Sequence, residues 1–310
     1  MISAEHLKNS KEKFAILILA HTDPVQLKRL VCALDYPLFD IFIHFDKAKD
    51  IGDFNFNEYN LKHSELTIIP DRIRVNWGDI SIVKATLNMY QTAFNKNKYS
   101  RYITLSGLDY PILSNDEIYQ QLSNPNIEFI MGSPLEPSKL HKVECFYYFH
   151  HKFIGKIINL ITTTLYRKLK ICFGKSYIKT SKGEKWEFYF SPQWHALSGA
   201  FVEYMLEFLA ENPYYYKHFR FTYAPDELLI PTLLFNSPFK NNALISNFPE
   251  GTHYNLKTSI HYLNYDYKVK VFDENDYETL IGSGKCFARK LSSNKSEKLI
   301  EMLNQKRNKN

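Results

Sequence analysis

Apolar runs and amphipathic stretches alternate along the first third of the chain. Residues 13–20 form a nearly continuous apolar run, which predicts a parallel strand covered on both faces. The next residues, 21–24, turn into a helix that ends near Leu34, with Asp23 as its N-cap. Further elements are predicted at 40–46, 66–70 and 102–105 as strands and from Ile80 to about Phe94 as a helix. This alternation predicts an α/β fold with a mostly parallel central sheet and helices on both faces.

Polar or aromatic side chains follow several of these predicted strands. Ligands of parallel sheets bind beyond the carboxyl ends of the strands, so we expect His21, Asp46, Trp77 and Asp109 to point into one crevice. Each also has a structural explanation, as a cap, a strand end, a core aromatic or a turn residue. Their shared position at strand ends favours a binding site.

Two adjacent carboxylates, Asp226 and Glu227, follow Pro225 and precede an apolar run that reaches Leu234. This order predicts the first turn of a helix, because proline lacks the amide hydrogen left unpaired there and acidic groups face the positive end of the helix dipole. The pair can therefore serve helix stability alone. The alternative is that one carboxylate is a catalytic base.

Composition limits the class of protein. The 310 residues are 45% hydrophobic and 15% aromatic, enough for one large α/β domain or two small ones and too apolar for a disordered chain. The net charge of +6 is modest and matters only where it is clustered. The cysteines contain no CxxC pair, so we expect buried free thiols in a reducing compartment. They are Cys32, Cys145, Cys172 and Cys286.

The N-terminal 14 residues are polar, and the apolar run that follows, 15–20, is too short to span a membrane. It also lacks the cleavage pattern of a signal peptide. These features predict a cytoplasmic protein.

Seven segments resemble, in the same order, the core-2/I-branching β-1,6-N-acetylglucosaminyltransferases and the related peptide O-xylosyltransferases, including short bacterial members. The segments are ILILAHTDPVQLKRL (16–30), IHFDK (43–47), VNWGDISIVKATLNM (75–89), YITLSGLDYPILSNDEI (102–118), QWHALSGAFVEYML (193–206), YAPDELLIPTLL (223–234) and CFARKL (286–291). The resemblance implies one GT-A-like nucleotide-sugar-binding domain, 1–291, followed by a polar tail, 292–310, that is either helical or frayed. It also implies metal-independent, inverting transfer from a UDP-sugar, with no cofactor.

Inverting transfer requires a base that takes the proton of the acceptor hydroxyl while its oxygen attacks the anomeric carbon. One positioned carboxylate is sufficient, and it contributes about 10²- to 10⁴-fold to the rate. The family's catalytic glutamate lies in an S-P-D-E motif, which the resemblance maps onto Glu227. Asp226 is then expected near the sugar or the acceptor. Ala224 replaces the usual serine, which removes a possible cap but leaves the base.

The leaving diphosphate needs positive charge. The chain has no Asp-x-Asp triplet, and family members of this kind use basic side chains instead. Their L-F-A-N/R-K-F segment matches residues 286–291, which assigns the diphosphate to Lys290, with Arg289 beside it. The second basic group of the family is not matched, and either His261 or Lys268 can take its place. The alternative interpretation of Arg289 and Lys290 is that they are solvent-exposed residues at the end of a helix.

The other matched segments imply the rest of the site. Gln193 and Trp194 belong to a Q-W motif near the acceptor and donor sugar, although Ser191–Pro192 replaces the usual Gly-Ser. An aromatic face suits the C–H surface of a sugar, and the alternative for Trp194 is a core position. Asp109 is expected to contact both donor and acceptor. The donor side further includes His21, Asp46, Val75 and Trp77.

Residues 146–185 match the family poorly and are unusually basic. Nine Lys and Arg and one Glu lie between Lys152 and Lys185, a balance of +8, and an apolar stretch, 153–166, precedes most of them. This pattern resembles an interfacial segment that contacts anionic lipid, here on the inner membrane face. The alternative is a solvated insertion folded over the active site.

We therefore expect a glycosyltransferase that moves N-acetylglucosamine or xylose to a hydroxyl of a glycan or lipid-linked acceptor. The alternative is a nonenzymatic carbohydrate- or nucleotide-binding module on the same scaffold. A binding module has no need of a base, so Glu227 together with Lys290 favours the enzyme. Nucleic acid is not an expected partner, because the aromatics near the basic segment match no recognition module.

Overall fold

The computed structural model describes residues 12–308 apart from 53–54, 150–151 and 250. The polar N-terminal residues 1–11 and the last two residues of the expected tail lie outside the described part. The first half contains β1 (Phe14–Ala20), α1 (Pro24–Ala33), β2 (Phe39–Phe45), β3 (Leu66–Ile68), α2 (Ile80–Lys96), β4 (Arg101–Ser106), β5 (Asp109–Pro111), α3 (Asn115–Leu122) and β6 (Glu128–Met131).

The second half is richer in short elements, and most of its strands have two or three residues. They are β7 (Ser133–Pro134), α4 (His141–Glu144), α5 (Lys152–Leu169), β8 (Tyr177–Lys179), β9 (Lys185–Glu187), β10 (Tyr189–Phe190), β11 (Ala196–Ser198), α6 (Gly199–Glu211), α7 (Pro213–Lys217), α8 (Leu229–Phe235), β12 (Ala243–Ile245), β13 (His261–Leu263), α9 (Tyr277–Ile281), β14 (Phe287–Arg289) and α10 (Glu297–Arg307).

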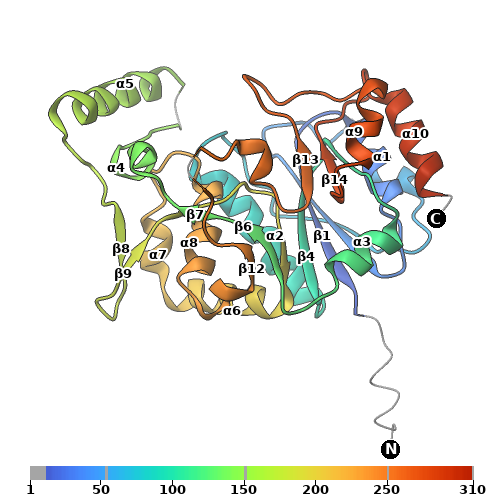
Figure 1. The fold of residues 1–310 in the computed structure, drawn as a ribbon, viewed down its shortest axis with the longest axis horizontal. Coiled ribbons are helices and arrows are strands. Elements are labelled where there is room, and N and C mark those ends of the chain that lie inside the picture. The colour runs from blue at the N-terminus through green and yellow to red at the C-terminus, as the bar shows by residue number, and fades with distance from the viewer. Residues whose placement is uncertain (1–11, 53–54, 150–151, 250, 309–310) are drawn as a thin grey trace, which may run out of the picture.

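The predicted sheet is present, with the strand order β12-β6-β11-β4-β1-β2-β3 (Figure 1). β1 pairs in parallel with both β2 and β4, and β2 pairs in parallel with β3. β11 is antiparallel to its neighbours β4 and β6. The mostly parallel central sheet is confirmed, and the carboxyl ends of β1, β2 and β4 meet at one edge.

Helices cover both faces of this sheet, as the α/β pattern predicts. Side chains of α2, α6 and α8 pack on one face in a cluster that includes Leu17, Met89 and Leu233. Side chains of α1 and α3 pack on the other face with Ile16 and Leu30. Alternate residues of β1 thus enter different clusters, which explains why the strand is apolar on both faces.

The predicted N-cap of α1 is also present. The Asp23 carboxylate accepts a hydrogen bond from the Gln26 amide at 3.0 Å, and its other oxygen accepts one from the Ser293 amide at 2.9 Å. The cap therefore also ties the start of α1 to the segment that follows β14.

A second sheet, with the order β13-β14-β5, forms beside the first. β14 runs antiparallel to β5, so Arg289 lies opposite Asp109. α10 packs its Leu299 and Leu303 side chains into a third apolar cluster behind this sheet. The C-terminal segment is therefore helical and packed, and the frayed alternative does not apply to its described residues.

Two expectations about local structure were wrong. Asp226 and Glu227 do not lie in a helical first turn: Pro225–Glu227 is a 3-10 turn, and α8 begins two residues later. Ala224 precedes this turn in the left-handed conformation, with φ 51°. Of the cysteines, Cys145 and Cys286 are buried free thiols, whereas Cys32 and Cys172 are exposed because one lies on the solvent side of α1 and the other follows α5.

Candidate active site

A pocket of about 240 Å³ lies at the carboxyl ends of β1, β2 and β4. This pocket lies where the sequence predicted a crevice, beyond the carboxyl ends of the strands. The side chains that surround it come from both halves of the chain. They are Leu19, Ala20, His21, His44, Asp46, Val75, Trp77, Ile82, Ser106, Gln193, Trp194, Asp226 and Arg289.

One wall is the segment from Arg72 to Trp77, which is attached to the end of β2. Asp46 accepts hydrogen bonds from the Ala48 amide at 2.8 Å and the Val75 amide at 3.1 Å. The Arg72 guanidinium donates to the backbone carbonyls of Phe45, Asp46 and Lys49. Asp46 therefore fixes the wall that carries Val75 and Trp77, in addition to lining the pocket.

Trp77 is 72% exposed, which excludes the core alternative for this residue. Its ring lies edge-on to Tyr223 at 5.7 Å. The following Gly78 has φ +83°, a conformation that favours glycine, and its carbonyl accepts the Ala224 amide at 3.0 Å. This bond joins the Trp77 loop to the turn that carries the two carboxylates.

Glu227 directly follows Asp226, which lines this pocket, and two polar groups hold its carboxylate. Lys142, on α4, places its ammonium 2.8 Å from Oε2. Tyr254, in the 3-10 turn Tyr254–Leu256, donates its hydroxyl to Oε1 at 3.1 Å. The Lys142 ammonium also lies 5.0 Å from the ring centre of Phe190, so it is held by an aromatic face as well as by the carboxylate.

Asp226 faces the pocket in an environment that disfavours its charged form. Burial, and then the adjacent Glu227 carboxylate, raises the pKa of Asp226 to about 7 from an ordinary value of 3.8. Burial and Glu227 also raise the pKa of Tyr254, while Arg289 acts in the opposite direction. Tyr254 thus lies within electrostatic range of both carboxylates and of the basic side of the site.

Asp109 lies behind the pocket and is fully buried. Arg289 donates to its Oδ1 at 2.8 Å, and His261 Nε2 lies 3.0 Å from Oδ2. Burial alone would raise the pKa of Asp109, but Arg289 and His261 outweigh it and hold that pKa below its usual range. The Arg289 guanidinium also stacks on Trp194 at 4.3 Å, so its orientation is fixed on two sides.

Lys290 follows Arg289 at the end of β14 and is partly buried. Burial and the neighbouring Arg289 lower the pKa of Lys290. Among the described residues, no carboxylate pairs with its ammonium. The two other candidates for a basic contact lie elsewhere: His261 is fully buried against Asp109, and Lys268 is exposed and does not line the pocket.

His21 is influenced by the same basic groups. Desolvation lowers the pKa of His21, and Lys290 and Arg289 act in the same direction, against the opposing effect of Asp46. His21 lines the pocket directly after β1, and its electrostatic neighbours include Asp46 and the basic pair.

Gln193 and Trp194 line the pocket from the loop before β11, and both are largely buried. The Gln193 side-chain nitrogen is buried and has no hydrogen-bond partner among the described residues. A buried donor without a partner is costly unless a ligand or water accepts from it. This donor and the Trp194 ring give the pocket one polar and one flat apolar contact.

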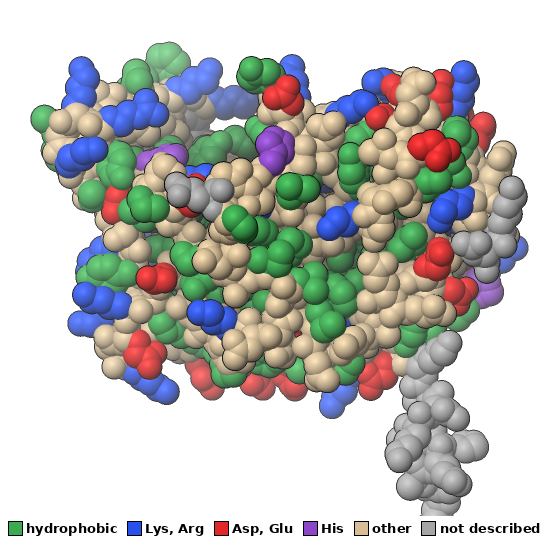
Figure 2. All heavy atoms as spheres, viewed as in Figure 1, with side chains coloured by type: hydrophobic (Ala, Val, Ile, Leu, Met, Phe, Trp, Pro, Cys, Tyr) green, Lys and Arg blue, Asp and Glu red, His purple; other side chains and the backbone are tan. Residues whose placement is uncertain are grey.

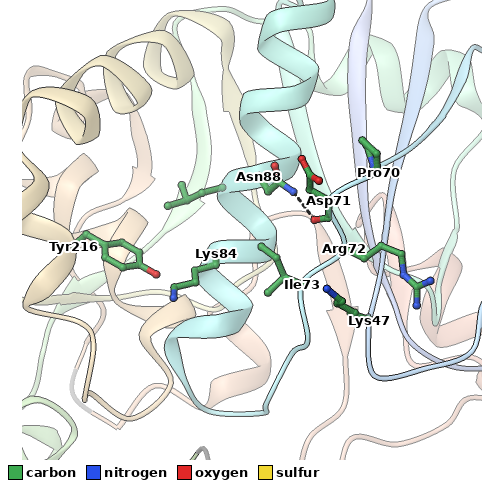
Figure 3. A pocket seen from close by; sticks show the side chains of 9 residues that line it. Lys47, Pro70, Asp71, Arg72, Ile73, Lys84, Asn88 and Tyr216 are labelled. Atoms are coloured by element: carbon green, nitrogen blue, oxygen red, sulfur yellow. Dashed lines mark hydrogen bonds between the residues drawn. The ribbon is translucent and has the colours of Figure 1, made fainter.

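Two further hollows adjoin this region. One, of about 920 Å³, lies between the 70–73 segment and α2 and includes Lys47, Lys84 and Tyr216 (Figure 3). There the Asn88 amide donates to the Asp71 carbonyl at 3.0 Å. This hollow contains neither predicted carboxylate. The other, of about 650 Å³, shares Asp46, Val75 and Trp77 with the central pocket and is closed on one side by α5.

No group of three or more His, Cys, Asp or Glu side chains in the described ranges is arranged to hold a metal ion. The charged or titratable side chains that line the pocket include Asp46, Asp226 and Arg289, and Glu227 and Lys290 follow the last two in the chain. Such a set can take a proton through a carboxylate and hold an anion through a basic side chain.

Comparison with known families gives the same assignment as the segments. The sequence model of the Core-2/I-Branching enzyme family matches residues 14–280. The chain belongs to the core-2/I-branching enzyme family. The central sheet, with helices on both faces, agrees with the GT-A-like fold expected of a core-2/I-branching family member.

Curated relatives of this core-2/I-branching family member include xylosyltransferase 2 of Canis lupus familiaris. That protein is 23% identical over 310 residues, which cover 94% of this chain and 33% of the relative. Xylosyltransferase 2 of Rattus norvegicus is 23% identical over 309 residues with the same coverage. Xylosyltransferase 1 of Homo sapiens is 24% identical over 124 residues, 39% of this chain and 13% of the relative. The chain spans about a third of the length of the curated relatives it matches most fully.

The structure brings most of the sequence-predicted residues of this family member to one place. Asp109 and His261 support Arg289 from behind, and Lys268 is apart. Sequence reasoning missed Lys142 and Tyr254, the two partners of Glu227. Neither lies in a matched segment, and nothing local separates one tyrosine from the 22 in the chain.

Proposed function

We propose that this protein is a metal-independent, inverting glycosyltransferase that moves a sugar from a UDP-sugar to a hydroxyl of a glycan or lipid-linked acceptor. The observation that carries the proposal is the position of Glu227. Its carboxylate is held by Lys142 and Tyr254, and it directly follows Asp226, which lines the same pocket as Arg289. Lys290 follows Arg289 directly after β14 ends.

In the proposed reaction Glu227 is the general base. The acceptor hydroxyl gives its proton to a Glu227 oxygen, and the acceptor oxygen forms a bond to the anomeric carbon. The bond between that carbon and the diphosphate oxygen breaks on the opposite face, and UDP leaves with the electron pair. The developing negative charge is stabilised by Lys290 and Arg289, and Asp109 and Trp194 already orient Arg289 before the reaction.

The remaining lining residues have binding roles in this proposal. Trp194 offers its ring to the C–H face of the sugar, and the unpartnered Gln193 nitrogen can donate to a sugar hydroxyl. Asp226, with its raised pKa, can donate a hydrogen bond below about pH 7 and accept one above it. His21, Asp46, Val75 and Trp77 form the wall for the nucleotide.

The donor sugar proposed is xylose or N-acetylglucosamine. The curated relatives named above are xylosyltransferases, which supports xylose. N-acetylglucosamine follows from the resemblance to the β-1,6-branching enzymes. The central pocket is small, about 240 Å³, which suits a single sugar ring better than a long glycan.

The proposal is tested by incubating the protein with UDP-xylose and UDP-N-acetylglucosamine and measuring thermal stability and UDP release, with and without acceptor glycans. A ligand present at 100 times its dissociation constant stabilises a protein by about 2.7 kcal/mol, which a melting curve detects. Acceptor-dependent UDP release is the expected result. Stabilisation without release, with any of the acceptors, would instead identify a nonenzymatic binding module.

A further inference from the structure

The helix α5 is attached to the protein by its polar side. Asn159 accepts the Tyr148 amide at 2.7 Å, and the Thr162 hydroxyl donates to the Phe146 carbonyl at 2.8 Å. One turn further on, the Tyr166 hydroxyl donates to Glu144 at 2.7 Å. These hydrogen bonds occupy one face of α5 and hold it to the segment between α4 and α5.

The opposite face of α5 is apolar and open to solvent. The exposed fractions are 71% for Phe153, 45% for Ile157, 68% for Leu160 and 52% for Ile161. Their spacing, i, i+4, i+7 and i+8, places them on one side of the helix. Ile154 adjoins this side and is 47% exposed. Amphipathic helices of soluble domains normally bury this side, so the orientation of α5 is reversed.

Basic side chains border the exposed apolar face. Lys152, Lys156, Arg167 and Lys168 are all exposed on α5, and none forms an ion pair with a carboxylate among the described residues. Lys and Arg gather over this helix at the upper left of Figure 2. Figure 1 shows α5 projecting at that end of the molecule, opposite α10.

We propose that α5 is a membrane-binding helix that lies in the interface of a bilayer rich in anionic lipid. Its 18 residues give a length of about 27 Å, and the exposed apolar side chains would enter the acyl boundary while the basic ones meet lipid phosphates. The positive charge of α5 favours an anionic bilayer over a second copy of the chain. A second copy of the chain would bring two faces of the same sign together, whereas an anionic bilayer complements both the apolar and the basic groups.

No helix of the described chain has the length and apolar content to cross a bilayer, so this contact is peripheral. It also orients the pocket. Gly155 and Asn159 on the inner side of α5, with the stems of Lys152 and Lys156 at its border, close the 650 Å³ hollow that shares Trp77 and Asp46 with the central pocket. A bilayer bound to α5 would therefore lie close to the mouth of the site. The membrane contact itself does not depend on the proposed chemistry.

Flotation of the full chain with vesicles tests the proposal. One set of vesicles contains phosphatidylglycerol and phosphatidylethanolamine, and the other contains phosphatidylcholine alone. The protein is expected to float with the anionic vesicles at low salt, to be released as salt rises, and to bind the neutral vesicles weakly.

Two double variants separate the contributions, and neither touches a residue that lines a pocket. R167Q/K168Q removes two charges and should lower partition onto anionic vesicles about 30-fold, or about fivefold per charge. F153S/L160S removes two exposed apolar side chains and should lower partition at least about tenfold on the same vesicles. Both alter exposed positions, so circular dichroism and the melting temperature should match the wild type.

Matched controls lie outside α5. Leu256 is 67% exposed, close to the 68% of Leu160, and the Lys298 side chain is 75% exposed and pairs with Glu274 at 3.5 Å. L256S and K298Q should leave partition unchanged. The proposal is overturned if the wild type stays unbound with anionic vesicles at low salt, or if neither α5 variant weakens binding. It is also overturned if F153S/L160S dissociates a dimer, since the apolar face would then belong to a second copy.

Discussion

At the scale of single residues, Glu227 combines two needs that usually conflict. A base must be ionised and oriented, yet free enough to take a proton. The Lys142 ammonium lies 2.8 Å from Oε2 and orients the carboxylate, and the neutral Tyr254 hydroxyl donates to Oε1. An acceptor hydroxyl can replace the Tyr254 hydroxyl without breaking the ion pair, so Oε1 is the oxygen expected to take the proton.

Replacing Lys142 should weaken catalysis without removing it. In K142Q the carboxylate loses the partner that orients it, so kcat/KM near pH 7 should fall about tenfold. K139Q is the matched control, because Lys139 is three residues away and pairs with Glu136 instead. Equal kcat/KM values for K142Q, K139Q and the wild type would show that the ion pair plays no part in the reaction.

Asp226 should make stability depend on pH. Its folded pKa of about 7 exceeds the ordinary value of 3.8, so between these values the folded protein holds a proton that the unfolded chain has lost. This contribution is full below about pH 4 and is lost as pH rises through 7. The free energy of unfolding in urea should therefore fall more between pH 5 and pH 8 for the wild type than for D226N, by about 2 kcal/mol. The exposed D71N variant should behave as the wild type, and identical losses in D226N would contradict the raised pKa.

The sequence alone predicted residues that follow buried strands better than residues in short or irregular segments. His21 and Asp46 could be predicted from the sequence because a strand end fixes where the next side chain points. Lys142 and Tyr254 could not be predicted, because a four-residue helix and a 3-10 turn are too short to show a hydrophobic periodicity. Asp109 was expected to face the ligand but is buried, since pairing of β5 with β14 puts Arg289 in front of it.

At the scale of elements, the turn that carries the carboxylates depends on a contact between distant segments. The Gly78 carbonyl accepts the Ala224 amide, and Ala224 takes a left-handed conformation before the 3-10 turn. Proline and acidic residues are compatible with either a helical first turn or a 3-10 turn, so the local pattern could not decide between them. The tertiary hydrogen bond explains why α8 starts only at Leu229.

The attachment of α5 should depend on Gly155. A Cβ at this position would lie 2.4 Å from the Tyr148 carbonyl oxygen, so alanine must push the helix away from the segment that holds it. G155A should destabilise the packed helix by about 1 to 3 kcal/mol, seen as faster hydrogen exchange of amides between 156 and 166.

The control for this prediction is T164A, on the exposed side of the same helix. Alanine favours helix there and meets no neighbour, so protection should be kept or increased. Unchanged protection in G155A would show that α5 is not held at this contact.

At the scale of the whole molecule, the second sheet completes the site. Arg289 and Asp109 are 180 residues apart, yet β14 pairs with β5 so that the two side chains meet at 2.8 Å. The α/β alternation predicted the first sheet, because consecutive strands pair in that part of the chain. It gave no sign of the second sheet, whose three-residue strands are too short to recognise.

Metal independence follows from this arrangement as a prediction. With Arg289 and Lys290 stabilising the diphosphate, EDTA should leave the transfer rate essentially intact. K290A should weaken UDP binding and slow transfer by about 10²-fold, while K298A, at an exposed lysine on α10, should match the wild type in both. If EDTA abolished activity and manganese restored it, a metal and not this basic pair would stabilise the leaving diphosphate.

The most direct measurement compares turnover and UDP binding in E227Q. The amide keeps the shape of the side chain but cannot take a proton, so acceptor-dependent transfer should fall by about 10²- to 10⁴-fold while the dissociation constant for UDP stays within about twofold of the wild type. Turnover in E227Q equal to that of the wild type would remove Glu227 from the role of base and contradict the account.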